Sequence, residues 1–340
     1  MEKLLGKTLD ELKAAAVECG LKPFVGNQLC QWLYSSRVVS WDSMTNISKA
    51  SRQALMLRYE LGTSAPLAVA HSSDGTRKYL FSGAGDFAVE AVVIPDEDRR
   101  TLCVSTQAGC KMGCRFCMTG RQGWHGNLSA AEILNQFLSV EDGSSLTNAV
   151  FMGMGEPLDN YREVSRVLEI LTAPWGFGWS PKRITLSTIG VLPTLKSYLD
   201  TQRCHLAVSL HNPFPEERLS LMPVQKPWPL SDVLDLIRQY DFSGQRRVSF
   251  EYTMFAGFND DKRHADALSK LLRGLECRVN LIRFHRIPDF PYDCSSDISM
   301  QLFRDRLNKN GIICTIRSSR GEDILAACGL LAGQRSLPSQ

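Results

Sequence analysis

Apolar positions recur with two different periods along the chain, and the changes of period divide it into parts. Over residues 1–64 the apolar positions follow helical spacing, and Thr8 with Glu11 forms a capping box before the first helical stretch. Residues 65–100 instead contain three short runs typical of β-strands, with a turn signal at Asp74. The pattern predicts a small helical N-terminal accessory domain and then a short β meander.

From about residue 101 the pattern changes again, because β-branched apolar runs now alternate with helical segments. The runs are TLCVST, NAVFMGM, RITLSTI, HLAVSLH, RVSFEYTMF, CRVNLIRF and IICTIR. Such alternation is typical of βαβ units around a parallel sheet. Six or seven strands would form a full or partial β/α barrel, or a doubly wound sheet. We therefore expect an α/β core over residues 101–333 and a disordered tail over residues 334–340.

Composition narrows the class of protein. With 44% hydrophobic and 22% charged residues, the chain has the composition of a soluble globular protein, which excludes a disordered chain, a collagen-like fibre and a coiled coil. No stretch approaches the ~18 uninterrupted apolar residues of a membrane helix. The N-terminal MEKLLGKTLDELKAAA lacks the apolar region of a secretory signal. We expect a cytoplasmic protein that does not bind membranes.

Three of the eleven cysteines have a spacing with chemical meaning. An odd count without a secretion signal indicates reduced thiols, metal ligands or redox chemistry. Cys110, Cys114 and Cys117 form a CxxxCxxC loop directly after the run TLCVST. Three such thiolates can hold three corners of a [4Fe–4S] cluster and leave one iron open to a small molecule. A structural zinc site is the alternative, but zinc favours paired CxxC elements or added histidines, and His125 lies outside any paired spacing.

Further candidate ligand contacts lie where predicted strands end. In FMGMGEP, Gly153 and Gly155 would let a ligand approach the backbone, and Glu156 would accept a hydrogen bond from an ammonium group. The serines of RITLSTI and HLAVSLH also end their strands. Taken alone, such glycines usually mark a tight turn and such a serine usually caps a helix. Barrels of this class place active sites at the carboxyl ends of their strands, which favours a shared site.

Taken together, these motifs resemble the radical S-adenosylmethionine (SAM) superfamily and, within it, the RlmN/Cfr family of RNA adenosine methyltransferases. The resemblance covers about residues 20–333 and is carried by VEAVVIPDEDRRTLCVSTQAGCKMGCRFC, FMGMGEPLDN, ITLSTIG, AVSLHNPFPEERLSLMPV and RGEDILAACGLLAG. It implies a partial, TIM-like β/α radical SAM barrel with a [4Fe–4S] cluster on the three cysteines. It also implies SAM contacts at Gly155, Glu156, Ser187, Ser209, Leu210 and His211.

The resemblance also implies three catalytic residues and a reaction. The family methylates a ring carbon of adenine, for which we expect C2 rather than C8. Cys328 would carry the methyl group and bond to the base, Glu90 would remove the ring proton, and Cys103 would attack Cys328 to form a disulfide and free the product. Without the family, Glu90 is more simply a solvent-facing strand residue, and each cysteine is more simply a small buried hydrophobe.

One position departs from the family pattern. Where the family has an Asn that contacts SAM, before a Pro, this chain reads RFHRIP and places His285. We expect His285 to take over that contact in a divergent RlmN-like member.

Partners are predicted more coarsely. The resemblance implies RNA, ribosomal RNA ahead of transfer RNA, an electron donor such as flavodoxin or ferredoxin, and a monomer. The helical domain over residues 1–64 is a candidate for RNA binding, and the alternative is that it only covers the barrel. Basic residues that phosphates could use cluster near the expected active face: Lys111, Arg115, Arg121, Arg246, Arg247, Arg283, His285, Arg286, Arg317 and Arg320. Two alternatives stay open: a radical SAM enzyme that modifies a protein or peptide, and a non-enzymatic RNA-binding protein with a structural metal centre.

Overall fold

The computed structural model describes residues 1–83, 87–141, 143–244 and 246–333. The predicted tail, residues 334–340, lies outside this part of the chain. No helix among the described residues is both long and apolar enough to cross a membrane.

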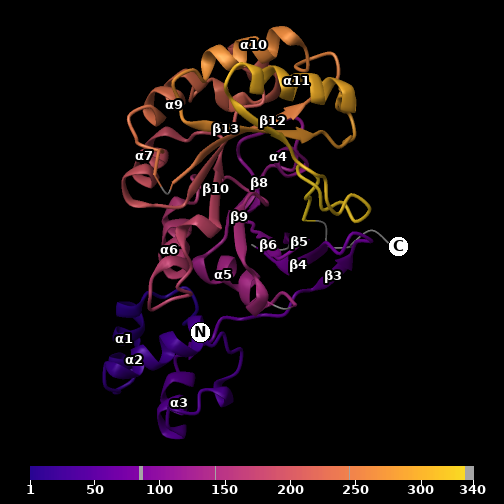
Figure 1. The fold of residues 1–340 in the computed structure, drawn as a ribbon. Helices are drawn as coiled ribbons and strands as arrows, with labels where there is room; N and C mark the ends of the chain where they lie inside the picture. The colour runs from indigo at the N-terminus through magenta and orange to yellow at the C-terminus, as the bar shows by residue number, and fades with distance from the viewer. Residues whose placement is uncertain (84–86, 142, 245, 334–340) are drawn as a thin grey trace.

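The N-terminal residues form a small helical unit at the foot of the barrel (Figure 1). Its helices are α1 (Leu9–Glu18), α2 (Phe24–Cys30), the π-helical turn Gln31–Ser35 and α3 (Lys49–Met56), and strand β1 (Glu2–Lys3) pairs with β2 (Tyr59–Glu60). The predicted capping box is confirmed, because Thr8 and Glu11 each accept a backbone N–H of the other at the start of α1. The unit contacts the barrel through Cys30, whose thiol lies 3.0 Å from the Trp175 carbonyl.

Ten strands form the main sheet. They are β3 (Ala68–His71), β4 (Arg77–Ser82), β5 (Ala88–Asp96), β6 (Arg99–Cys103), β9 (Asn148–Phe151), β10 (Ile184–Thr188), β11 (His205–Ser209), β12 (Val248–Met254), β13 (Cys277–Arg283) and β14 (Ile313–Ile316). Their order is β14-β13-β12-β11-β10-β9-β6-β5-β4-β3, parallel from β14 to β6 and antiparallel from β6 to β3. The predicted partial β/α barrel is therefore confirmed, and the meander continues its sheet.

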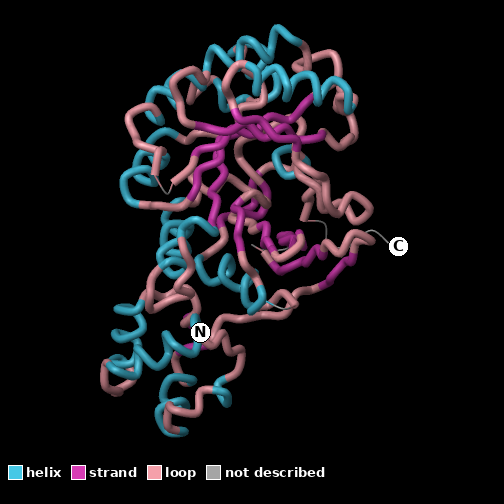
Figure 2. Tube along the Cα trace, viewed as in Figure 1, coloured by secondary structure: helices cyan, strands magenta, loops and turns pink. Residues whose placement is uncertain are grey.

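Helices cover the outer face of the parallel strands (Figure 2). They are α5 (Ala130–Leu138), α6 (Tyr161–Thr172), α7 (Leu192–Thr201), α8 (Pro215–Leu221), α9 (Leu230–Ile237), α10 (Lys262–Leu271) and α11 (Asp297–Lys309). Helix α6 is amphipathic: it buries Val164, Val167, Leu168 and Leu171 while its charged residues face outward. Strand β12 is buried along nearly its whole length, as a parallel strand covered on both faces should be.

After β14 the chain forms neither helix nor strand, and residues 317–333, the C-terminal segment, lie along the β meander (Figure 1). The meander holds the start of this segment. The backbone N–H of Gly321 donates to Asp74 (2.9 Å), and Ser72 donates to Asp323 (2.6 Å). Partial burial would raise the pKa of Asp74, but its hydrogen bonds from Gly321 and Thr76 lower that pKa to about 2. Asp74 is therefore ionised at neutral pH.

A buried arginine ties together the carboxyl end of β11. Arg218 on α8 is fully buried and donates to the carbonyls of Leu210 (3.1 Å) and Ser209 (3.0 Å) and to the side chain of Gln225 (2.5 Å). Burial lowers the pKa of Arg218 to about 10, so the guanidinium stays charged at neutral pH. The strand end that carries Ser209 and Leu210 therefore depends on one side chain.

We expect Arg218→Leu to lower the free energy of unfolding by about 3–5 kcal/mol, because each buried acceptor that loses its donor costs about 1–3 kcal/mol. Urea denaturation followed by circular dichroism measures the loss. Exposed Arg273 gives the control, since Arg273→Leu should change stability by no more than about 0.5 kcal/mol. Equal midpoints for the two variants would contradict this account of Arg218.

Candidate functional site

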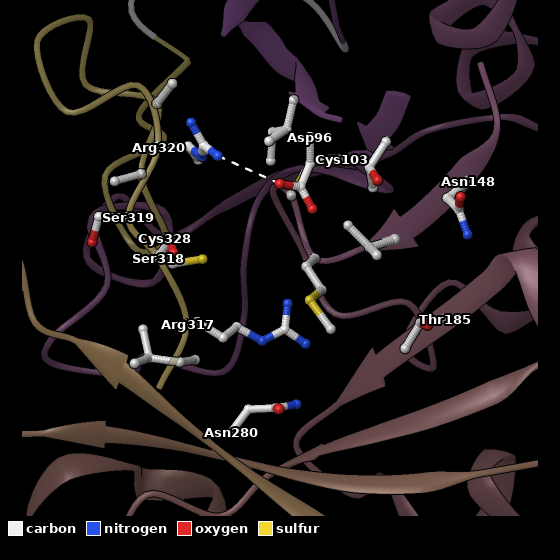
Figure 3. Close-up of a pocket in the computed structure, with 18 of the residues that line it drawn as sticks. Asp96, Cys103, Asn148, Thr185, Asn280, Arg317, Ser318, Ser319, Arg320 and Cys328 are labelled. Carbon is white, nitrogen blue, oxygen red and sulfur yellow. Dashed lines mark hydrogen bonds and ion pairs between the residues drawn. The ribbon is translucent and has the colours of Figure 1, made fainter. Parts of the chain in front are cut away.

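A cavity of about 690 Å³ lies between the inner side of the sheet and the C-terminal segment (Figure 3). Cys103 reaches it from the end of β6, Cys117 from the cysteine loop, His285 from beyond β13, and Cys328 from the C-terminal segment. Segments far apart in the sequence thus bring four of the predicted site residues to one space.

Cys103 and Cys328 are both free thiols, and no disulfide joins them. The Cys328 side chain is exposed to the cavity, whereas Cys103 is half-buried in the sheet. Burial and, to a smaller extent, the neighbouring Cys328 raise the pKa of Cys103 to about 12. Arg317, whose guanidinium reaches into the same space in Figure 3, acts on the pKa of both thiols in the opposite direction. Cys103 is therefore protonated at neutral pH.

The three spaced cysteines lie in a loop between two short paired strands, β7 (Gln107–Gly109) and β8 (Trp124–Asn127). Gly109 has φ +73°, and a Cβ there would lie 1.9 Å from the Gly123 carbonyl oxygen, so only glycine permits this loop entry. Cys117 caps helix α4 (Met118–Arg121). Burial raises the pKa of Cys110, Cys114 and Cys117.

The glycines of FMGMGEP let the end of β9 lie directly against the chain that follows β6. A Cβ on Gly153 would lie 2.6 Å from Ser105 Oγ, and one on Gly155, at φ +97°, would lie 2.6 Å from Gln107 Cβ. Glu156 is buried and accepts hydrogen bonds from Thr188 Oγ1 (2.6 Å) and the backbone N–H groups of Leu158 and Ile189 (both 3.0 Å). These bonds join the ends of β9 and β10.

Glu156 is the one predicted ligand contact whose own titration falls near neutral pH. Burial raises the pKa of its carboxyl to about 7, although Thr188 and Ile189 lower it by donating hydrogen bonds. A cationic ligand beside Glu156 would favour the carboxylate.

The serines and the histidine at the ends of β10 and β11 are differently placed. Ser187 and Ser209 are half-buried, and Leu210 is fully buried. His211 is buried in a left-handed conformation (φ +57°), and its Nδ1 accepts the Thr253 N–H at 3.0 Å. Burial lowers the pKa of His211 to about 3, so the ring is neutral. The ring packs edge-on against Phe116 of the cysteine loop, with centroids 4.9 Å apart, and thereby supports that loop.

His285 lines the cavity, but part of its hydrogen-bonding capacity is already used. Its Nε2 lies 3.0 Å from Ser319 Oγ, and its Nδ1 lies 4.0 Å from Glu322. Burial lowers the pKa of His285, so the ring is neutral at pH 7. The ring therefore joins the end of β13 to the C-terminal segment.

The simple interpretation of Glu90 as a solvent-facing residue is wrong. Only 3% of its side chain is exposed, and its carboxylate pairs with Lys78 Nζ at 3.2 Å. Glu90 is not among the described residues that line the cavity, and its Oε2 accepts the N–H of Ala332 at 2.9 Å. Lys78 was missed in the sequence, where its only signal is a charge inside the apolar run RKYLF.

Comparison with known proteins shows to which family the chain belongs. A model of the radical SAM superfamily matches residues 104–268, and a model described as the ribosomal RNA large subunit methyltransferase N-terminal domain matches residues 2–61. The chain is 58% identical to a probable dual-specificity RNA methyltransferase RlmN of Porphyromonas gingivalis, over 99% of this chain and 98% of that protein. The chain belongs to the RlmN family.

More distant relatives agree with this assignment. The dual-specificity RNA methyltransferase RlmN of Syntrophus aciditrophicus is 40% identical over 96% of this chain and 95% of that protein. A radical SAM methyltransferase from Sphaerobacter thermophilus superposes with a TM-score of 0.93 at 37% identity, covering 98% of this chain and all of that one (100%). The RlmN-family chain thus has a radical SAM fold beyond its N-terminal unit, and the predicted resemblance is confirmed.

Membership in the RlmN family implies SAM and an iron–sulfur cluster, and the residues present fit both. Three buried or half-buried thiols lie in one loop. Cys110 and Cys117 both lie close enough to Cys114 to raise the pKa of its thiol. Among the described residues, no three His, Cys, Asp or Glu side chains converge as ligands of a single ion would.

We expect Gly155→Ala to weaken SAM binding by about tenfold or more, because the new Cβ pushes the end of β9 away from Gln107 at a cost of about 1–3 kcal/mol. Equilibrium dialysis of anaerobically reconstituted protein against labelled SAM measures the effect. Gly178→Ala is a matched control, since Gly178 also has positive φ (+67°) but no heavy atom lies within 4 Å of a Cβ there. Equal affinities for both variants would contradict this interpretation.

Proposed function

We propose that this RlmN-family chain is a radical SAM RNA methyltransferase that methylates a ring carbon of adenine, C2 rather than C8, through a methylated Cys328. The observation that carries the proposal is the position of two free thiols, Cys103 and Cys328, at one cavity that also reaches Cys117 of the cysteine loop. An adenine ring carbon is too weak a nucleophile to take a methyl group directly from SAM. A first thiol that carries the carbon to the base, and a second thiol that releases the product, would make the methylation possible.

The cysteine loop and the strand ends supply the binding residues. Cys110, Cys114 and Cys117 would hold a [4Fe–4S] cluster, and the predicted contacts would hold SAM: Gly155, Glu156, Ser187, Ser209, Leu210, His211 and His285. When bound, the cluster and SAM would supply the methyl group and the radical that moves it to the ring carbon. The superfamily match and the fit of the thiol loop support this assignment.

The chain's own residues would then complete the reaction. Cys328 exposes its thiol to the cavity and would carry the carbon to the base. Glu90 pairs with Lys78 and does not line the cavity, so it would have to leave that pair to accept the ring proton. The adduct would give up its unpaired electron to the bound cluster, and Cys103 would attack the Cys328 sulfur. The sulfur–carbon bond would then break, its electron pair would stay with the carbon, which takes up a proton, and a Cys103–Cys328 disulfide would remain. Burial keeps Cys103 protonated at neutral pH, so its attack requires loss of that proton in the same step.

Basic residues around the cavity supply contacts for RNA. Lys182, Arg183 and Arg247 are exposed at its edge, and none of them forms an ion pair within the described part of the chain. Phosphates would bind such free cations. Arg246, predicted among the phosphate contacts, is instead buried and donates to the Leu199 carbonyl at 2.9 Å.

The proposed partners follow from the family. We expect an RNA substrate, because the relatives are named RNA methyltransferases, and ribosomal RNA ahead of transfer RNA, because the matching N-terminal family model is named for ribosomal RNA. A flavodoxin or ferredoxin would supply electrons, and the chain would act as a monomer in the cytoplasm. A peptide-modifying radical SAM enzyme has no use for the thiol pair, and a non-enzymatic RNA-binding protein has no use for the cavity.

We expect the two thiol variants to fail differently. Cys328→Ala removes the carbon carrier, so no protein–RNA bond forms. Cys103→Ala leaves every step before release intact, so a conjugate that resists denaturation accumulates. A nuclease-sensitive gel shift after denaturation, in reactions with RNA, SAM and reductant, measures it.

The double variant and a core thiol sharpen this test. Adding Cys328→Ala to Cys103→Ala should erase the conjugate. Cys204 is buried in the core away from the cavity, so Cys204→Ala should behave as the parent does. Absence of conjugate from Cys103→Ala, with SAM cleavage preserved, would mean that the chain does not use two thiols.

A further inference from the structure

The segment that carries Cys328 has no regular secondary structure of its own, so other parts of the chain must hold it in place. Two of the contacts that do so come from a single buried ion pair. Lys78 on β4 and Glu90 on β5 are diagonal neighbours on paired strands, since Lys78 lies opposite Val92 and Glu90 opposite Leu80. Their Nζ and Oε1 atoms are 3.2 Å apart, and only 3% of each side chain is exposed. Each of them also bonds to the backbone of the C-terminal segment.

These backbone contacts lie on both sides of Cys328. Lys78 Nζ donates to the carbonyl of Leu325, three residues before Cys328, at 3.3 Å. Glu90 Oε2 accepts the N–H of Ala332, four residues after Cys328, at 2.9 Å. Leu325 has φ +54°, a conformation that costs a leucine energy and persists only where neighbouring contacts impose it. The pair therefore holds a short loop at its two ends, with Cys328 between them.

The same loop is also bonded to the start of α4, directly after the cysteine loop. The N–H of Met118 donates to the Gly329 carbonyl (2.8 Å), and Thr119 Oγ1 donates to the Leu331 carbonyl (2.6 Å). Cys328 is thus held between the meander on one side and the cysteine loop on the other.

Burying two opposite charges rarely adds stability beyond what apolar residues of similar size would give. This pair also forms hydrogen bonds to one loop, the loop that carries Cys328. These bonds fix where that loop lies. We propose that Lys78 is a positioning residue: together with Glu90 it docks the Cys328 loop so that the thiol lies at the same cavity as Cys103. This inference rests on the proposed function, because the position of Cys328 matters only if Cys328 carries the carbon. The docking itself is testable in the protein alone.

The test compares Lys78→Met, which keeps the length of the side chain but not its charge, with Lys78→Arg, which keeps charge and donors. Hydrogen exchange of the amides of residues 321–333 should become at least tenfold faster in Lys78→Met. The yield of the Cys103–Cys328 disulfide in a glutathione redox buffer, where oxidised glutathione takes up the two electrons, should fall at least tenfold. Lys78→Arg should restore both measurements towards those of the parent.

Two further variants separate positioning from general destabilisation. Arg306→Met breaks a two-bond ion pair with Asp266, between α11 and α10, and should leave the exchange of residues 321–333 unchanged. Lys78→Met combined with Glu90→Gln leaves no buried charge unpaired, so it should fold, and yet the segment should stay loose because the Leu325 carbonyl has lost its donor.

Each outcome decides one claim. Parent-like exchange and disulfide yield in Lys78→Met and in the double variant would overturn the docking role, even if the parent methylates RNA. Loosening confined to residues 321–333 would support the docking role, even if the parent were to leave RNA unmethylated. In that second case the proposed function would fail on its own.

Discussion

The sheet of this barrel does not close. Its parallel part ends at β14 on one side, and beyond β6 it continues as the antiparallel strands β5, β4 and β3. A closed barrel of this size would fill its interior with side chains. Here the opening is covered by the irregular C-terminal segment, and a cavity of about 690 Å³ lies beneath it. The cavity, the position of Cys328 and the role of the meander all depend on this gap.

The C-terminal segment forms neither helix nor strand, so its position depends on hydrogen bonds to neighbouring parts of the chain. Asp74 and Ser72 hold its start, the Lys78–Glu90 pair holds both sides of Cys328, and Thr119 connects it to the cysteine loop. The meander is thus more than a link between the helical unit and the barrel. It holds Cys328 at the cavity that Cys103 of β6 also lines.

Local sequence signals predicted the features that depend on neighbouring residues. The capping box of Thr8, the strand–helix alternation and the CxxxCxxC loop each lie within a few residues, and their structures follow from that spacing. The family resemblance added Cys103 and Cys328, which the fold brings to one cavity. The cysteine, SAM and catalytic roles stay predictions.

Contacts between distant residues could not be predicted in this way. Lys78 and Leu325 are far apart in sequence, so no periodicity connects them. Alternation in β5 suggested that Glu90 faces solvent, yet the face on which it lies is covered by the C-terminal segment, which the pattern of one strand cannot reveal. Arg246 looked like a phosphate contact in the sequence because a charge is usually exposed, but its guanidinium supports α7 from within.

The central claim is that Cys328 carries the transferred carbon, and mass mapping of its peptide tests that claim directly. The reconstituted protein is incubated with SAM labelled in its methyl group and is then digested. The account predicts a single labelled methyl on the peptide that contains Cys328 and none on the peptide that contains Cys103. An unlabelled Cys328 in a preparation that methylates RNA would contradict it.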